Sequence, residues 1–211
     1  MNSRTFLSRP VIAAGLVSAL AFAAPATAQT FTPIDPPATG SMNVFVEQIG
    51  TDHTADVEQS NNLQTAEVDQ DGVNNDAEID QEDSGSHIAV IGQDGNDNIA
   101  SVSQTGAGEA VANLSQTGNE NEILLAQNDN GLLGTAAEIV QSGNNNMIGL
   151  VQDGSDNQAR LTQNGDNNTM TASQLNSGNR LEWVQDGSGL SDMTVEQTGG
   201  QTIFILQTNG T

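Results

Sequence analysis

The chain has 211 residues, of which 27 are Asp or Glu and only four are Lys or Arg, so its formal net charge at pH 7 is -23. A surface this negative repels nucleic acid and anionic lipid, which excludes the usual phosphate-binding proteins. The chain has no Cys, which excludes a disulfide framework, an iron–sulfur cluster and a thiolate zinc site. Aromatic residues make up 3% of the sequence, too few for a conventional core.

Residues 1–28 have the parts of a secretory signal peptide. Two arginines precede an apolar run over residues 11–24, and residues 26–28, Ala-Thr-Ala, form a small-x-small cleavage site. The apolar run is shorter than the roughly 20 residues that span a bilayer, so we expect cleavage rather than anchoring. Residues 29–41 contain three prolines, which lack the N–H that a strand ladder needs, and they are predicted to form an extended leader.

From residue 42 to residue 211 the sequence repeats one short unit fifteen times. Each unit contains a key glutamine, and successive key glutamines are 10 to 14 residues apart, most often 11. A large apolar residue stands two positions before this glutamine in 14 units, and Ala or another apolar residue stands four positions before it. Residues at even spacing share one face of a β-strand, so each unit is predicted to be a short strand with an inward stripe that ends in Gln. The glutamines are Gln48, Gln59, Gln70, Gln81, Gln93, Gln104, Gln116, Gln127, Gln141, Gln152, Gln163, Gln174, Gln185, Gln197 and Gln207.

The segments between the strands also follow a pattern. Six positions before the key glutamine Asn is the commonest residue, and His53 and His87 take the same place in two units. We therefore expect a structural polar role for both histidines, and we do not expect an enzyme. Two positions after the glutamine ten units have Gly and five have Asn or Asp; these residue types tolerate positive φ, so the chain is predicted to bend there through a left-handed conformation. The corner asparagines are Asn75, Asn98, Asn121, Asn146, Asn157, Asn168 and Asn179, and the arc glycines are Gly50, Gly72, Gly95, Gly106, Gly118, Gly143, Gly154, Gly165, Gly187 and Gly199.

This pattern predicts an all-β fold, a β-solenoid of about seven and a half coils with two units, or about 22 residues, in each coil. A strand faces the next strand across the core and pairs with the strand two units later, which gives two parallel sheets. Gln48 then stacks on Gln70, and the buried amides form ladders in which each amide bonds the one above and the one below. Trp183, the one Trp in the chain, is predicted to lie in the core opposite the small Ala172.

The two ends of the solenoid are predicted to be polymerisation edges. Fifteen is an odd number, so the first and last strands fall in the same sheet. Neither end strand carries the Lys, Pro or bulge that normally blunts a sheet edge. The residues predicted to form these edges are Val44, Phe45 and Val46 in the first unit, and Ile203, Phe204, Ile205 and Leu206 in the last.

The unit resembles the curlin repeat of the curli subunits, which form extracellular amyloid fibres in bacterial biofilms. That family carries Gln-x-Gly-x-x-Asn-x-Ala-x-x-x-Gln, and residues 93–104 read Gln-Asp-Gly-Asn-Asp-Asn-Ile-Ala-Ser-Val-Ser-Gln. The resemblance implies a structural subunit that is secreted through the periplasm and stacks end to end into cell-surface fibres for matrix and adhesion. The implied partners are other copies of the chain, a second curlin-type subunit and an outer-membrane export pore, with no nucleic acid, no cofactor and no membrane span in the mature chain.

Two features depart from that family, and two other roles remain open. Typical curli subunits have about five repeats of 22 residues, and the major subunit has a Gly/Asn-rich leader where this chain is Pro-rich. Within the same class, the chain could be the minor nucleating subunit. Outside it, the abundant Asp residues suggest a non-polymerising, calcium-binding β-roll, although the period of 11 differs from the nonapeptide repeat of that fold.

Overall fold

The computed structural model describes residues 43–209, so the predicted signal peptide (1–28) and leader (29–41) lie outside the described residues. The described part contains fifteen β-strands and no helix, so none of its segments is a helix that could cross a membrane. The strands are β1 (Asn43–Thr51), β2 (Thr54–Gln59), β3 (Thr65–Val73), β4 (Asp76–Gln81), β5 (His87–Asn96), β6 (Ile99–Thr105), β7 (Ala110–Asn119), β8 (Glu122–Asn128), β9 (Thr135–Asn144), β10 (Met147–Asp153), β11 (Gln158–Asn164), β12 (Thr169–Leu175), β13 (Arg180–Asp186), β14 (Thr194–Thr198) and β15 (Thr202–Thr208).

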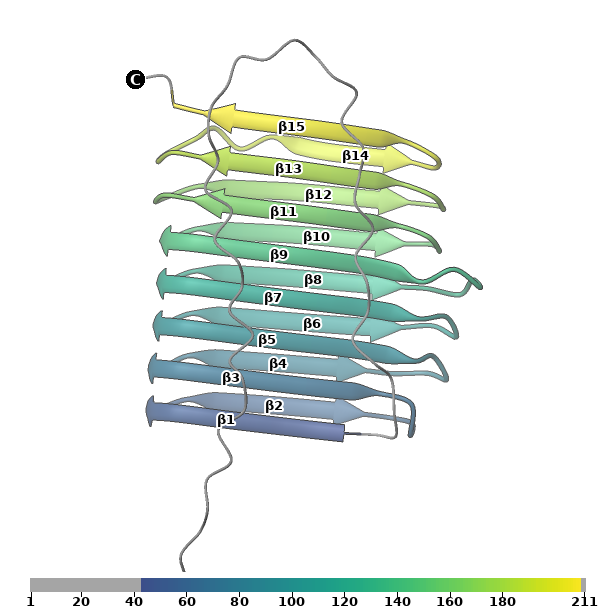
Figure 1. Cartoon of the computed structure of the whole chain (residues 1–211), viewed down its shortest axis with the longest axis horizontal. Helices are drawn as coiled ribbons and strands as arrows, with labels where there is room; N and C mark the ends of the chain where they lie inside the picture. Colours follow the sequence, from purple (N-terminus) through teal and green to yellow (C-terminus); the bar gives the residue numbers. More distant parts are fainter. Residues whose placement is uncertain (1–42, 210–211) are drawn as a thin grey trace, which may run out of the picture. The chain divides into compact units, whose positions relative to one another are not determined.

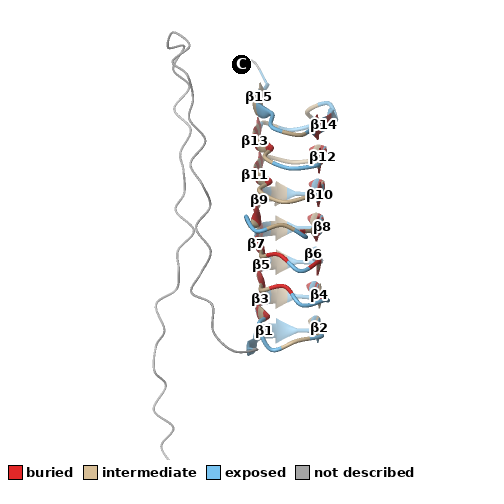
Figure 2. Cartoon of the chain, turned by 90° about the vertical axis from the view of Figure 1, so that its right-hand side faces the viewer, coloured by how far each residue is buried: buried red, intermediate tan, exposed pale blue. Residues whose placement is uncertain are grey.

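The strands form two parallel sheets that face each other across one core. Odd-numbered strands make an eight-stranded sheet in the order β1-β3-β5-β7-β9-β11-β13-β15, and even-numbered strands make a seven-stranded sheet from β2 to β14. Figure 1 shows the strands stacked in chain order, and Figure 2 shows the two sheets as two separate columns. The predicted all-β solenoid with two strands in each coil is therefore confirmed.

Alternation of small apolar and polar residues explains why each unit forms a strand. In β11 burial alternates strictly, so that Ala159, Leu161 and Gln163 point inward and the residues between them are partly exposed. The same alternation recurs across the stack and builds a core of Ala, Val, Ile and Leu. Trp183 is fully buried in this core, as predicted. Ala172, which was predicted to lie opposite Trp183, belongs to the same core cluster and lies on β12, in the facing sheet.

The coils stack in strict register because equivalent residues pair. The key glutamines always pair with each other, as do glycines at the ends of the longer strands, for example Gly72 with Gly95 and Gly95 with Gly118. A Cβ atom added to Gly95 would lie 1.9 Å from the carbonyl oxygen of Gly118, and the φ angle of Gly95 is +125°. Both the backbone conformation and the spacing between coils therefore require glycine there.

The prediction of a left-handed bend holds for some Asn and Asp residues and is wrong for others. All ten arc glycines have positive φ, as do Asp83 (65°) and Asn176 (62°). Asn61, Asp129 and Asn209 are not among the positive-φ residues. The side chains of Asn61 and Asp129 instead accept hydrogen bonds from the N–H two residues further on, both at 2.7 Å. These are Asx-turns, in which the side chain rather than a left-handed residue reverses the chain.

The two edges of the solenoid differ in a way that the sequence analysis did not predict. We call the arcs from an odd strand to the next even strand the regular edge, and the arcs from an even strand to the next odd strand the variable edge. On the regular edge the key glutamines are 11 residues apart in six of the seven arcs, whereas on the variable edge the spacing varies from 10 to 14. The longest arc of the variable edge, between β8 and β9, exposes Leu132 and Leu133.

Candidate functional site

The key glutamines of the eight-stranded sheet form one continuous hydrogen-bonded ladder. Each Nε2 donates to the Oε1 of the glutamine in the next coil, at distances from 2.7 to 3.0 Å. The donor is always the residue nearer the N-terminus, so the ladder has a direction. Its members are Gln48, Gln70, Gln93, Gln116, Gln141, Gln163, Gln185 and Gln207.

A second ladder with the same direction runs through the seven-stranded sheet. Its amides are 2.7 to 2.8 Å apart. Most Nε2 atoms also donate a second hydrogen bond to a backbone carbonyl oxygen of the facing sheet, as Gln70 does to Thr54 O at 3.0 Å. The ladders thus join coil to coil and sheet to sheet. The members of this second ladder are Gln59, Gln81, Gln104, Gln127, Gln152, Gln174 and Gln197.

Loss of one amide in the middle of a ladder is expected to destabilise the whole solenoid. Gln116 accepts from Gln93 at 2.9 Å and donates to Gln141 at 3.0 Å and to Ile99 O at 3.0 Å. Gln116→Leu leaves buried partners unsatisfied, and each such group costs about 1–3 kcal/mol. We expect denaturant unfolding of Gln116→Leu to show that loss, whereas Ser115→Ala, on the outward side of the same strand, leaves stability nearly unchanged. Equal stability of the two variants would contradict a stabilising role for the ladder.

The two ladders end differently at the two ends of the solenoid. At the N-terminal end, Oε1 of Gln59 is buried and makes no hydrogen bond within the described residues. At the C-terminal end, Nε2 of Gln207 donates, within residues 43–209, only one long hydrogen bond of 3.3 Å, to Ser191 O. One end therefore presents an unused acceptor, and the other presents a weakly used donor.

The structure separates the seven predicted corner asparagines into two columns. Asn98 illustrates the regular edge: its Nδ2 donates to Asn75 Oδ1 at 3.1 Å and to Gly118 O at 2.8 Å. Asn121, Asn146 and Asn168 continue this column. Asn157 and Asn179 form a separate pair on the variable edge.

A second set of left-handed residues was missed by the sequence analysis. These residues stand four positions after the key glutamine on the regular edge, with φ near +57° in Asn74, Asn145 and Asn167 and +55° in Asp97. Asp and Asn are the non-glycine residues that tolerate this conformation best, and they dominate this position. Their recurrence at that offset is the sequence signal that could have located the second bend.

His87 and Asp129 are the two buried titratable residues of the variable edge. His87 Nε2 lies 2.9 Å from Glu82 O, while His87 Nδ1 and Asp129 Oδ2 make no hydrogen bond within residues 43–209. Burial lowers the pKa of His87 and raises that of Asp129. The hydrogen bond to the backbone of Glu82 and the charges of Asp83 and Asp129 oppose the shift in the pKa of His87.

Protonation of His87 is expected to destabilise the fold in mild acid. Because its pKa in the folded state lies below the usual 6.5, the unfolded chain binds the proton first, and stability is lost as the pH falls from that value through the lowered pKa. Between pH 7.5 and pH 5 we expect the unfolding free energy to fall by up to about 2 kcal/mol relative to His87→Asn. Both proteins retain Asp69 and Asp129, so the difference reports His87 together with its charge interaction with Asp129. Parallel pH profiles would contradict this expectation.

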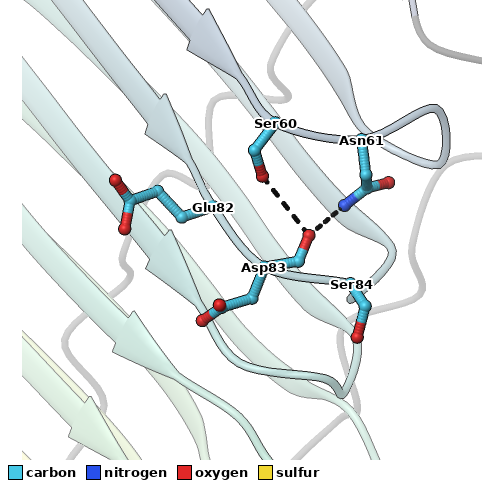
Figure 3. A pocket seen from close by; sticks show the side chains of 5 residues that line it. All are labelled: Ser60, Asn61, Glu82, Asp83 and Ser84. Carbon is cyan, nitrogen blue, oxygen red and sulfur yellow. Dashed lines mark hydrogen bonds between the residues drawn. The ribbon is translucent and has the colours of Figure 1, made fainter.

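A shallow depression on the variable edge is lined by Ser60, Asn61, Glu82, Asp83 and Ser84 (Figure 3). Ser60 Oγ donates to the carbonyl oxygen of Asp83 at 3.4 Å, and Asn61 Nδ2 donates to the same oxygen. These bonds tie one arc to the next, so the polar groups of the depression contribute to coil stacking.

Acidic side chains stack on the outer faces of the first coils. Glu47 pairs with Asp69 in register, and Glu58 pairs with Asp80. The pKa of Asp69 is raised, first by burial and then by the charge of Glu47 and other nearby carboxylates. The outward rows therefore repel one another at neutral pH.

The predicted polymerisation edges lie at the two ends of the stack. Every residue of β1 is exposed, with exposed fractions of 52% for Val44, 38% for Phe45 and 42% for Val46. In β15, Leu206 is 71% exposed, whereas Ile203 and Ile205 pack against the core and Phe204 is half-buried. Within residues 43–209, β1 pairs only with β3, and β15 only with β13.

Comparison with known families gives one match. The family model described as the curlin associated repeat matches residues 61–106 and 143–175, which contain β3 to β6 and β10 to β12. No curated protein and no solved structure matches the chain significantly. The matched segments have the same register and the same glutamine ladders as the coils on either side of them. The chain thus carries curlin associated repeats, and the predicted resemblance to the curlin-repeat family is confirmed.

Proposed function

We propose that the chain is a secreted structural subunit that assembles end to end into extracellular curli-type amyloid fibres. These fibres form part of the biofilm matrix and mediate adhesion to surfaces. The observation that supports this most directly is the pair of glutamine ladders, which run through every coil and stop at open sheet edges. Among residues 43–209, each end strand has one side without a partner strand, and a further coil can add there with the same amide and backbone bonds.

The proposed role requires export. Residues 1–28 are proposed to be a cleaved signal peptide, residues 29–41 a leader, and residues 42–211 the assembling domain. The chain passes through the periplasm and leaves through an outer-membrane pore, and a second curlin-type subunit is the expected partner. In this proposal the glutamines, asparagines and arc glycines serve assembly and not catalysis.

Fibre formation by the purified chain tests this proposal. We expect sedimentable fibres whose diffraction shows a strand spacing near 4.8 Å along the fibre axis. Ile205→Lys places a charge on the inward side of β15 and is expected to slow elongation strongly. Thr202→Lys adds the same charge at an exposed position of the same strand and serves as the control. Sedimented material without the 4.8 Å reflection would overturn the proposal.

Charge on the outer faces is expected to slow assembly at neutral pH. Each like-charged pair in stacked coils costs on the order of 0.8 kcal/mol at 5 Å in water, and the raised pKa of Asp69 means that stacking becomes more favourable as the pH falls through that pKa. The lag time is therefore expected to shorten from pH 7 to pH 4. Asp69→Asn should shorten the lag at pH 7 and weaken its dependence on pH. A lag independent of pH in both proteins contradicts this expectation.

A further inference from the structure

We propose that successive copies of the chain join with a half-coil rotation, so that β1 of one copy pairs with β14 of the preceding copy and β2 pairs with β15. This inference rests on the proposed self-assembly and specifies its contact. The starting point is that the fifteen strands leave β1 and β15 in the same eight-stranded sheet, while the seven-stranded sheet runs from β2 to β14.

Stacking without rotation leaves a gap. If β1 of the next copy paired with β15, the eight-stranded sheet would continue, but one strand position would be empty between β14 and the incoming β2. The backbone groups on both sides of that gap would lack partners, and unpaired buried backbone groups are costly. A half-coil rotation exchanges the two sheets and preserves strand direction, so β1 takes the position that follows β14 and no strand position is empty.

The unused amide groups at the two ends support the rotated contact. In every internal pair the glutamine of the earlier coil donates to Oε1 of the later one. With β2 on β15, Nε2 of Gln207 would face Oε1 of Gln59, the buried acceptor that makes no hydrogen bond within residues 43–209. Without rotation, Gln207 would face Gln48, and the gap in the other sheet would leave Gln59 without a donor.

The side chains also fit in the half of the rotated contact that β2 and β15 form. Alignment of the glutamines as in the internal pairs places the inward Val57 on Ile205, two residues that pack at the edge of the core cluster. On the outer face the same alignment places Glu58 beside Leu206, whereas Glu58 inside the chain stacks on Asp80. The outward apolar residues of β15 thus remove like-charge repulsion from this half of the junction, whereas the β1–β14 half brings Glu47 beside Glu196.

The rotated contact fixes two properties of the fibre. The fibre is polar, because every amide donates toward the same end. Each copy advances by about 36 Å, which is seven and a half coils at about 4.8 Å each, and it is turned by about half a revolution relative to its neighbour.

Disulfide trapping between copies tests the rotation, since the chain has no Cys of its own. We mix Glu58→Cys protein with Leu206→Cys protein, assemble fibres, oxidise them and measure covalent dimers on a non-reducing gel. Neighbouring strands of a sheet lie within the range that a disulfide requires. The matched control mixes Glu47→Cys with Leu206→Cys, the pair that stacking without rotation would bring together. We expect at least about a tenfold higher yield of mixed dimers from the Glu58 pair.

The outcomes separate the two proposals. Fibres in which the Glu47 pair crosslinks and the Glu58 pair does not would overturn the rotation and leave self-assembly standing. Absence of fibres from the unsubstituted chain would overturn both proposals. Helical symmetry measured on unsubstituted fibres gives an independent readout: an advance of about 36 Å with a rotation near 180° is expected, and the same advance with a rotation near zero contradicts the half-coil contact.

Discussion

Gly95→Ala is expected to destabilise the solenoid by roughly 3 kcal/mol or more. At φ +125° an L-residue is strained, and the added methyl group would lie 1.9 Å from Gly118 O, a backbone atom that cannot move without displacing a coil. Denaturant unfolding of the purified chain measures the loss.

Gly92→Ala is the matched control for this substitution. Gly92 lies on the same strand, and a Cβ added there meets nothing within 4 Å. Alanine also has a lower conformational entropy in the unfolded chain, so this variant is expected to be as stable as the unsubstituted protein or slightly more stable. Similar losses in the two variants would show that close coil spacing does not constrain the glycine column.

Trp183→Ala is expected to cost about 3–5 kcal/mol, because it opens a cavity in a core of mostly smaller side chains. Trp183 is fully buried, and its Nε1 donates to Gln207 Oε1 at 2.8 Å. Trp183→Phe retains most of the packing and loses this bond, so we expect a smaller loss of about 1 kcal/mol. Leu132→Ala, at a fully exposed position, should change stability little.

Fluorescence gives a second measurement on the same residue. Since the chain has one Trp, its emission reports this site alone, and we expect a blue shift on folding. An unshifted spectrum in folded protein would contradict the burial of Trp183.

The sequence predicted the fold well because one local rule repeats in every unit. Even spacing of Ala, a larger apolar residue and Gln defines the inward face, and the repeat length of two units fixes which strands pair. Gln48 on Gln70 and Gln59 on Gln81 follow from these two facts alone. Composition alone would have permitted intrinsic disorder.

The arcs were less predictable because several side-chain types can reverse a chain in the same space. Asn61 and Asn176 occupy equivalent positions, yet only Asn176 has positive φ, since Asn61 forms an Asx-turn within a different arc. The burial of Asp129 also depends on its arc, which is longer than the others on that edge. The identity of a single residue does not encode these differences.

The difference between the two edges has a consequence for tolerance of change. Extra residues between β8 and β9 leave the glutamine pairing of both sheets intact, as the 3.0 Å bond from Gln116 to Gln141 and the 2.8 Å bond from Gln127 to Gln152 show. Most of the variation in length is therefore absorbed on the variable edge, while the regular edge is held by its glycine and asparagine columns. Residues 130–133 offer a natural point for grafting a foreign peptide, which a fibre would then display at regular intervals along its length.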